Sequence, residues 1–273
     1  MKIFMSLIII VMMVSVMSVN AGVVVKMKQE AQGISMASQQ TMYIGSDRLR
    51  MEMSGEDQNQ TIIFRGDKNV FWVLDAKKKT YFEMTQDDMV KLKAQMENMQ
   101  QMMQEQMKNM PPEQRKMMEG MMPSGMPGEK KEKAVYTKKE SGVKVGKWTT
   151  THYIGTRGGN QTEELWTVDW SDIGFDRTDF GAMSKMADFF SALSQDATEF
   201  MKVGSEEWEK EMGISGMPVR WIHRINEKTS NEGSVEEISK KDLDSALFEL
   251  PAGYAKDQSP WEKQGAGMNP YMK

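Results

Sequence analysis

Methionine is concentrated in one segment of the chain, with the spacing of a helix face. Thirteen of the 43 residues from Met84 to Met126 are methionine, and the chain contains no cysteine. Apolar residues three or four positions apart form one stripe on a helix, and here they are Met89, Leu92, Met96, Met99, Met103, Met107 and Met110. A thioether is a flexible apolar group that adapts to partners of different shape, and it is also a soft ligand for copper(I). The stripe therefore suits the protein's own core, an apolar ligand, copper(I) or a partner helix.

Copper(I) binding is the main alternative to an apolar role for the stripe. Two groups of methionines could each bring sulfur atoms together on one helix: Met99, Met102 and Met103, and Met117, Met118, Met121 and Met122. The only two histidines lie far away in the sequence, and there is no cysteine to complete such a site. We therefore predict no metal site and no cofactor. A copper(I)-binding protein and an interaction scaffold that uses the methionine helix remain as alternatives.

The other polar residues indicate no catalytic site. The chain contains no G-x-S-x-G, no H-E-x-x-H and no glycine-rich phosphate loop. His152 and His223 each alternate with apolar residues in a strand pattern, which predicts core residues, or groups that orient a ligand if they face a cavity. The acidic residues between Asp169 and Asp179 lack the spacing of a calcium loop and are better suited to helix caps. We predict that the protein is not an enzyme.

The first 21 residues have the features of a secretory signal peptide. Lys2 provides the positive start, Ile3–Met17 is apolar, and Val19-Asn20-Ala21 resembles a cleavage site. At about 15 residues the apolar run is short for a membrane span, and no later run is long enough. We predict cleavage after Ala21, a periplasmic location and no membrane-spanning segment. Loss of Lys2 changes the net charge from −4 to −5, and mixed charges with a mild acidic excess do not favour nucleic-acid binding.

Alternating apolar and polar residues predict about six strands between Val23 and Met84. Within Asp47–Met53, Leu49 and Met51 alternate with charged residues, as in a half-buried strand. Residues 70–74 are apolar on both faces, as expected for a central strand covered on both sides. The turns between these strands are short, so we predict an antiparallel meander.

A methionine-rich helical insertion, residues 85–122, follows the first strands. Thr85 to Asp88 has the form of a capping box and begins the helix. Pro111 and Pro112 end it near residue 109, and a shorter helix is expected up to about Met122. Residues 123–133 have the composition of a flexible linker.

Strands return near Ala134 and surround a second helical insertion, residues 178–213. They are expected at 148–156, 163–170, 219–225 and 234–239. Between them, one helix face carries Phe180, Met183, Met186, Phe190, Leu193, Ala197 and Phe200. This order predicts an α+β fold with a single domain at 22–256 and a tail at 257–273. Two amphipathic helical insertions would lie on the concave face of one curved antiparallel sheet.

Three segments resemble a known group of proteins. They are Asn69–Tyr81, Leu165–Trp170 and Leu243–Tyr254. They are similar to segments of an uncharacterised family of exported bacterial proteins, which in turn resembles the outer-membrane lipoprotein carriers LolA and LolB. The resemblance implies a half-open antiparallel barrel, closed by helices over an apolar cavity that holds acyl chains. The first insertion is longer and richer in methionine than a carrier's lid helix, and no lid-latching arginine can be matched, so lipoprotein transfer itself is not implied.

These observations lead to the hypothesis of a carrier-like periplasmic protein. Its partner would be a hydrophobic ligand, either a lipid or a lipid-modified protein, held in the half-barrel beneath a methionine-rich helical lid. The residues expected to contact that ligand are Met96, Met99, Met103, Met107, Met186, Phe189, Phe190 and Trp221. The sequence specifies neither the ligand nor an oligomeric state.

Overall fold

One large sheet dominates the protein. The computed structural model describes residues 19–31, 36–55, 59–108, 110–111, 134–191, 193, 202, 205–225 and 228–258. The strands are β1 (Val19–Ala31), β2 (Met36–Ile44), β3 (Arg48–Ser54), β4 (Asn59–Arg65), β5 (Val70–Asp75), β6 (Thr80–Thr85), β7 (Val135–Val145), β8 (Trp148–Arg157), β9 (Asn160–Val168), β10 (Met217–Ile225), β11 (Lys228–Asp244) and β12 (Ala255–Lys256). The α-helices are α1 (Gln86–Lys108), α3 (Trp170–Ile173), α4 (Gly181–Phe190) and α6 (Glu206–Met212), and the 3-10 helices are η1 (Arg177–Phe180) and η3 (Ser245–Phe248).

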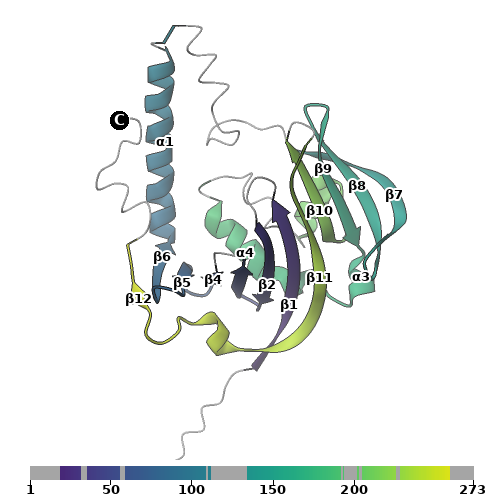
Figure 1. Ribbon diagram of the computed structural model, residues 1–273, viewed down its shortest axis with the longest axis horizontal. Coiled ribbons are helices and arrows are strands. Elements are labelled where there is room, and N and C mark those ends of the chain that lie inside the picture. Colours follow the sequence, from purple (N-terminus) through teal and green to yellow (C-terminus); the bar gives the residue numbers. More distant parts are fainter. Residues whose placement is uncertain are drawn as a thin grey trace, which may run out of the picture.

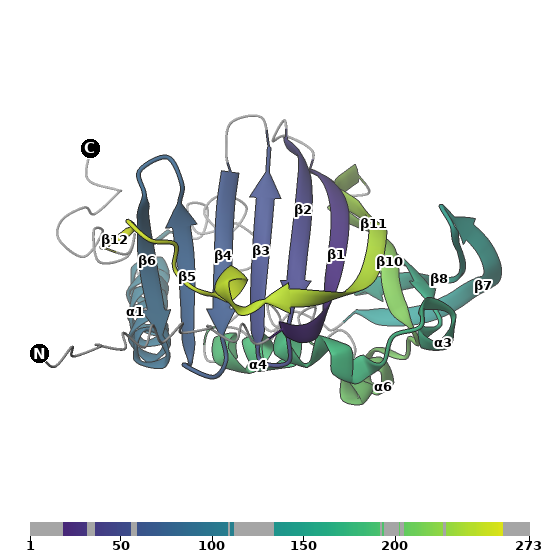
Figure 2. The same cartoon turned by 90° about the horizontal axis from the view of Figure 1, so that it is seen from below.

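The described strands form two antiparallel meanders joined into a single twelve-stranded sheet (Figure 2). Its order is β12-β6-β5-β4-β3-β2-β1-β11-β10-β9-β8-β7. The first meander contains the six strands predicted from the alternation of the sequence. β1 and β11 join the two meanders, with partners running from Val19 and Asp244 to Ala31 and Asn231. Of the described strands, only the short β12 is parallel to its neighbour, β6.

The sheet buries apolar side chains on both faces. Because side chains alternate between faces, Val23 and Val25 belong to the larger core cluster and Val24 to a second one. The larger cluster includes side chains of α4, so we call that side the helix-covered face. There Phe189 lies edge-on to Phe64 with ring centroids 5.7 Å apart, and Phe190 lies edge-on to Phe71 at 5.0 Å.

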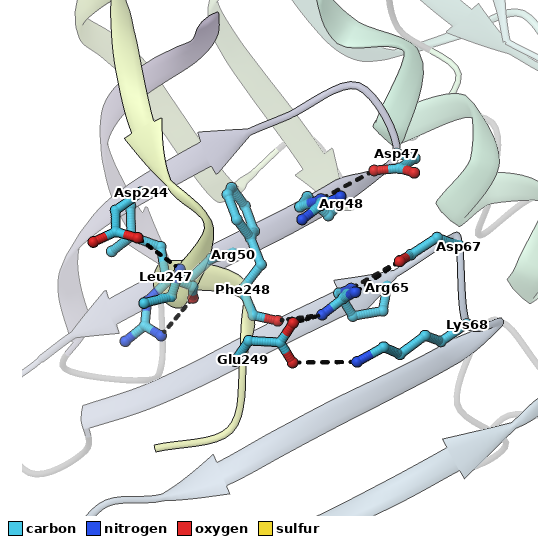
Figure 3. A network of polar contacts seen from close by, with 11 residues as sticks. Asp47, Arg48, Arg50, Arg65, Asp67, Lys68, Asp244, Leu247, Phe248 and Glu249 are labelled. Atoms are coloured by element: carbon cyan, nitrogen blue, oxygen red, sulfur yellow. Dashed lines mark hydrogen bonds and ion pairs between the residues drawn. The ribbon is translucent and has the colours of Figure 1, made fainter. Parts of the chain in front are cut away.

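The opposite face is covered by the C-terminal segment, which crosses the first meander through η3 (Figure 2). Phe248 of η3 is buried in the second core cluster. Arg65 of β4 holds this segment in place, because its guanidinium donates to the carbonyl of Phe248 and to the carboxylate of Glu249 (Figure 3). Arg50 donates to the carbonyl of Leu247 at 3.0 Å. The segment is therefore attached to the sheet by both apolar burial and hydrogen bonds.

Helix α1 begins where the sequence predicted, but most of it does not cover the sheet as a lid would. Thr85 and Asp88 form the predicted capping box, with the Thr85 N–H donating to the Asp88 carboxylate at 2.9 Å and the Asp88 N–H donating to the Thr85 hydroxyl at 3.3 Å. Met89 is fully buried in the larger core cluster. The helix then runs away from the β6 end of the sheet (Figure 1), and Met99 is 51% exposed. A helix of 23 residues is about 35 Å long, and after its first turns none of the described strands lies beneath it.

Several predicted segments fall wholly or partly outside the described residues. These are most of the signal peptide, the second helix of the methionine-rich insertion, the linker at 123–133 and most of the tail at 257–273. The predicted cleavage point after Ala21 falls within β1, which begins at Val19. None of the helices in the described part of the chain combines the length and apolar character that a membrane span requires.

Candidate ligand-binding site

An apolar cavity lies between the sheet and the helices of the second insertion. Its volume is about 530 Å³, and its walls include residues of β1, β2, β3, β9, β10, β11, η1, α4 and α6. Thioethers make up much of the wall: Met27, Met42, Met51, Met183, Met186, Met212 and Met217. Met42 and Met51 are direct partners across β2 and β3, while Met183 and Met186 are one turn apart on α4. The cavity therefore combines a hydrogen-bonded sheet with flexible, polarisable side chains.

The structure brings together only some of the ligand-binding residues predicted from the sequence. Met186 and Trp221 line the cavity. Phe189 and Phe190 lie on the same helix as Met186 but pack against Phe64 and Phe71 in the core.

The methionines predicted on α1 are placed differently. Met96 is half-buried and Met99 is mostly exposed, and neither belongs to the cavity wall. The side chains of Met103 and Met107 lie outside the described residues. Among the described residues, α4 and α6 cover the cavity and α1 does not.

One end of the cavity carries a row of polar side chains in register across neighbouring strands. Glu163 of β9 is the direct partner of His223 of β10, and His223 is the direct partner of Asn231 of β11. All three residues line the cavity, together with Arg157 and Tyr136. Cross-strand partners on one face lie about 5 Å apart, so these groups form a continuous polar edge beside the apolar wall.

Glu163 is the centre of this polar row. Arg157 donates to its Oε1 from Nε at 3.2 Å and from Nη2 at 3.0 Å. The hydroxyl of Tyr136 donates to its Oε2. Nδ1 of His223 lies 3.9 Å from Oε1, which is too long for a hydrogen bond. Among the contacts of the described residues, Glu163 is thus held by Arg157 and Tyr136, and His223 stands beside it.

Gly155 allows Tyr136 to reach Glu163 across an intervening strand. Gly155 of β8 is the direct partner of both Tyr136 on β7 and Glu163 on β9. A Cβ at this position would lie 2.9 Å from the Tyr136 ring and 3.0 Å from the Glu163 Cβ. The missing side chain therefore leaves the space through which the tyrosine crosses β8.

The next row along the strands is apolar, and here too a glycine makes room for the aromatic ring of a neighbouring strand. Trp221 is the partner of Leu165 on one side and of Gly233 on the other. A Cβ on Gly233 would lie 2.2 Å from the indole of Trp221, so the indole occupies the space above that glycine. The polar row and this aromatic row are two residues apart along each strand and share the helix-covered face.

Two residues of the cavity wall hold buried polar atoms that lack a hydrogen-bond partner among the described residues. They are Nε1 of Trp208 on α6 and Oδ1 of Asn231 on β11. Buried polar groups are normally paired, so each unpaired group calls for an explanation.

A second ionic cluster surrounds the neighbouring Glu164. Arg224 donates to its carboxylate at 2.6 Å, and Nε2 of His152 lies 3.0 Å from it. Burial raises the pKa of Glu164, but these two partners outweigh burial and leave it below its usual value. His152 is buried and stacked on Trp166 with centroids 4.2 Å apart. It is therefore a satisfied core residue, as its apolar strand pattern predicted, whereas His223 lines the cavity.

The described residues contain no group of three or more histidine, aspartate and glutamate side chains placed to hold a metal ion. The acidic residues of the α3 region serve as caps, as predicted. Asp169 accepts from the N–H of Ser171 at 2.9 Å, and Asp176 and Asp179 form a capping box around η1.

Several cavity residues were not predicted from the sequence. Met27, Met42 and Met51 lie in strands where alternation indicated burial but not which face would enclose a space. Arg157, Glu163 and Asn231 gave no motif, because their proximity depends on the register of four neighbouring strands, β8 to β11. The one pointer to this polar edge in the sequence was His223, which was expected to orient a ligand if it faced a cavity.

Fold and site together define a protein in which one open antiparallel sheet and a few helices enclose an apolar cavity with a polar edge. The chain belongs to the family described as domain of unknown function DUF4412, whose model matches residues 87–254. A comparison with curated proteins found no significant match.

Two solved structures show distant similarity. An uncharacterized conserved protein from Thermus thermophilus is 8% identical with a TM-score of 0.45, over 88% of this chain and 91% of that one. PNGF-II is 9% identical with a TM-score of 0.36, and the match covers 89% of this chain but 32% of PNGF-II. Neither similarity is high enough to transfer a function.

Proposed function

We propose that this protein binds an apolar or amphiphilic small molecule in the methionine-lined cavity and acts as a carrier, not as an enzyme. The observation that carries the proposal is a cavity of about 530 Å³ with seven methionines in its wall. This volume is within the range of small-molecule sites, which are mostly apolar with a few placed polar groups.

The mechanism is partition of hydrocarbon from water into the cavity. Each buried methylene contributes about 0.8 kcal/mol. Methionine side chains can change rotamer around ligands of different shape, so one cavity can accept related molecules. The helices that cover the ligand in this proposal are α4 and α6, with Met183, Met186 and Met212 facing the tail.

The wider setting of the proposal comes from the sequence. The predicted signal peptide supports export to the periplasm. The three segments resemble an uncharacterised exported family that is in turn similar to the LolA and LolB carriers, and this resemblance supports a half-barrel carrier of lipids or acylated molecules. The antiparallel sheet with helices on one face is consistent with that architecture.

Filling the cavity tests the proposal. The variant Met183→Trp places a bulky ring at a half-buried cavity position, and Met99→Trp makes the same change on the exposed part of α1. We expect native mass spectrometry of the full chain, purified from its own host, to show an additional mass that organic extraction removes. Met183→Trp should reduce the occupied fraction at least about tenfold, which corresponds to about 1.4 kcal/mol, and Met99→Trp should leave it unchanged.

The proposal is wrong if the natural protein carries no extractable molecule and binds no lipid added in excess. It is also wrong if both tryptophan variants lose the ligand equally, because the loss would then not depend on the cavity. Circular dichroism of both variants shows whether the fold is retained.

A further inference from the structure

The polar edge of the cavity has a composition that distinguishes between head groups. Its members in register are Glu163, His223 and Asn231. Glu163 presents a carboxylate, which only accepts hydrogen bonds when ionised, and Asn231 presents a buried amide oxygen without a partner among the described residues. The buried atom that lacks a partner on this edge is therefore an acceptor.

Charge points in the same direction. The guanidinium of Arg157 binds the Glu163 carboxylate through two nitrogens, so its positive charge is already matched. An anionic head group placed between His223 and Asn231 would lose its hydration without meeting an unmatched positive charge on Arg157. A cationic head would lose its hydration on entering this site. An uncharged group with hydroxyls meets neither cost.

We infer that the cavity selects amphiphiles whose head group is neutral and donates hydrogen bonds, such as the glycerol of a monoacylglycerol, over fatty-acid anions with the same tail. This inference rests on the proposed function, because it assigns the tail to the methionine-lined cavity. A hydroxyl donates to Oδ1 of Asn231 or to the Glu163 carboxylate, and it can accept in turn from His223. Binding would thus satisfy an acceptor that the described residues leave unpaired, and such an acceptor is costly to bury.

Three ligands with one shared tail separate the effects of donor and charge. They are 1-monolauroylglycerol, which is neutral with donors, methyl laurate, which is neutral without donors, and laurate, which is an anion. Binding of each to the full chain at neutral pH is followed by fluorescence of the cavity tryptophans Trp208 and Trp221 and by calorimetry. We expect the monoacylglycerol to bind about five- to tenfold more tightly than the methyl ester, as expected for one hydrogen bond, and laurate to bind most weakly.

Two variants then locate the effect. Asn231→Leu keeps the side-chain size and removes the amide, so the monoacylglycerol should lose its advantage in affinity over methyl laurate. Glu163→Gln removes the negative charge, so laurate should gain affinity about fivefold or more. Circular dichroism of each variant shows whether the fold is retained, and the comparison of ligands within one variant isolates the effect of the head group.

The outcomes separate this inference from the proposed function. If all three ligands bind equally, or laurate binds best, the head-group inference is wrong and the cavity proposal stands. If Asn231→Leu leaves the preference for the monoacylglycerol intact, the polar edge is not the head-group site. If none of the three binds, both the inference and the proposed function are overturned.

Discussion

Gly155 of β8 has no side chain, and this leaves room for Tyr136 to cross the strand. Tyr136 reaches Glu163 from two strands away, and the Glu163 carboxylate then faces the cavity. A glycine within a strand normally weakens it, since it packs nothing and is flexible when unfolded. Here it determines how the polar edge is built.

Adding a single methyl group at this site tests the arrangement. We expect Gly155→Ala to lower the free energy of unfolding by about 1–3 kcal/mol, because the Cβ overlaps the Tyr136 ring. The same substitution in a Tyr136→Ala background should cost less than half as much, since the overlap is gone. Gly181→Ala is the control, because its nearest neighbour would be 3.7 Å away. Urea denaturation measures all of these, and an equal cost of Gly155→Ala in both backgrounds would contradict the overlap.

Asp67 gives the attachment of the C-terminal segment a dependence on pH. Arg65 donates to its two carboxylate oxygens at 2.8 and 2.6 Å (Figure 3). Hydrogen bonding to Arg65, against a smaller opposing effect of burial, lowers the pKa of Asp67 from 3.8 to about 2. The folded state therefore binds its proton less readily than the unfolded state. The resulting stability is complete above about pH 5 and is lost as the pH falls towards about 2.

We expect Asp67→Asn to be less stable than the natural protein by about 1–2 kcal/mol at neutral pH, allowing for partial solvent screening. The difference should shrink steadily below about pH 4 and disappear near about pH 2. Denaturant unfolding at a series of pH values measures it, with Glu97→Gln on exposed α1 as the control for loss of one negative charge. A difference that stays constant over this range would show that the carboxylate charge is not responsible.

At the scale of elements, sequence periodicity predicted the type of each segment better than its bounds or its position, since the strand expected at 234–239 is β11 at Lys228–Asp244 and α4 ends at Phe190. The capping box at Thr85 and the prolines after residue 110 placed both ends of α1 correctly. The stripe on α1 did not reveal where it would pack, because the same apolar spacing suits a core, a lid or a partner. Burial settles this for Met89 and leaves Met99 exposed. The methionines that line the cavity lie instead in strands and in α4 and α6.

The 3-10 helix η3 is expected to be important for stability and not for ligand binding. Phe248 is 2% exposed and packs with Ile63, Trp72 and Leu74 on the face opposite the helices. We expect Phe248→Ala to cost about 3–5 kcal/mol of unfolding free energy. Leu247→Ala, at a partly buried position, should cost about 1–2 kcal/mol. Ligand affinity measured under folding conditions should be unchanged in both, and a loss of affinity in Phe248→Ala would show that the two faces are coupled.

At the scale of the whole molecule, local patterns specified the two meanders but not how they join. Each hairpin follows from alternation and a short turn, and these are visible in the sequence. The pairing of β1 with β11 connects segments from opposite ends of the chain, exemplified by Lys26 and Glu237, which are 211 positions apart. No periodicity encodes such a pair. Most residues of the cavity wall were unpredictable for the same reason, because they come from both meanders.

The pairing of β1 with β11 also affects the order in which the protein folds, because it can form only after the C-terminal strand has been made. Long-range strand pairing closes a large loop and forms slowly. While the C-terminal strand is still being synthesised, β1 keeps an unpaired edge beside the apolar Val23, Val24 and Val25, which can associate with other nascent chains. Production of this protein in good yield should therefore depend on keeping its N-terminal meander dilute or chaperoned until the last strands emerge.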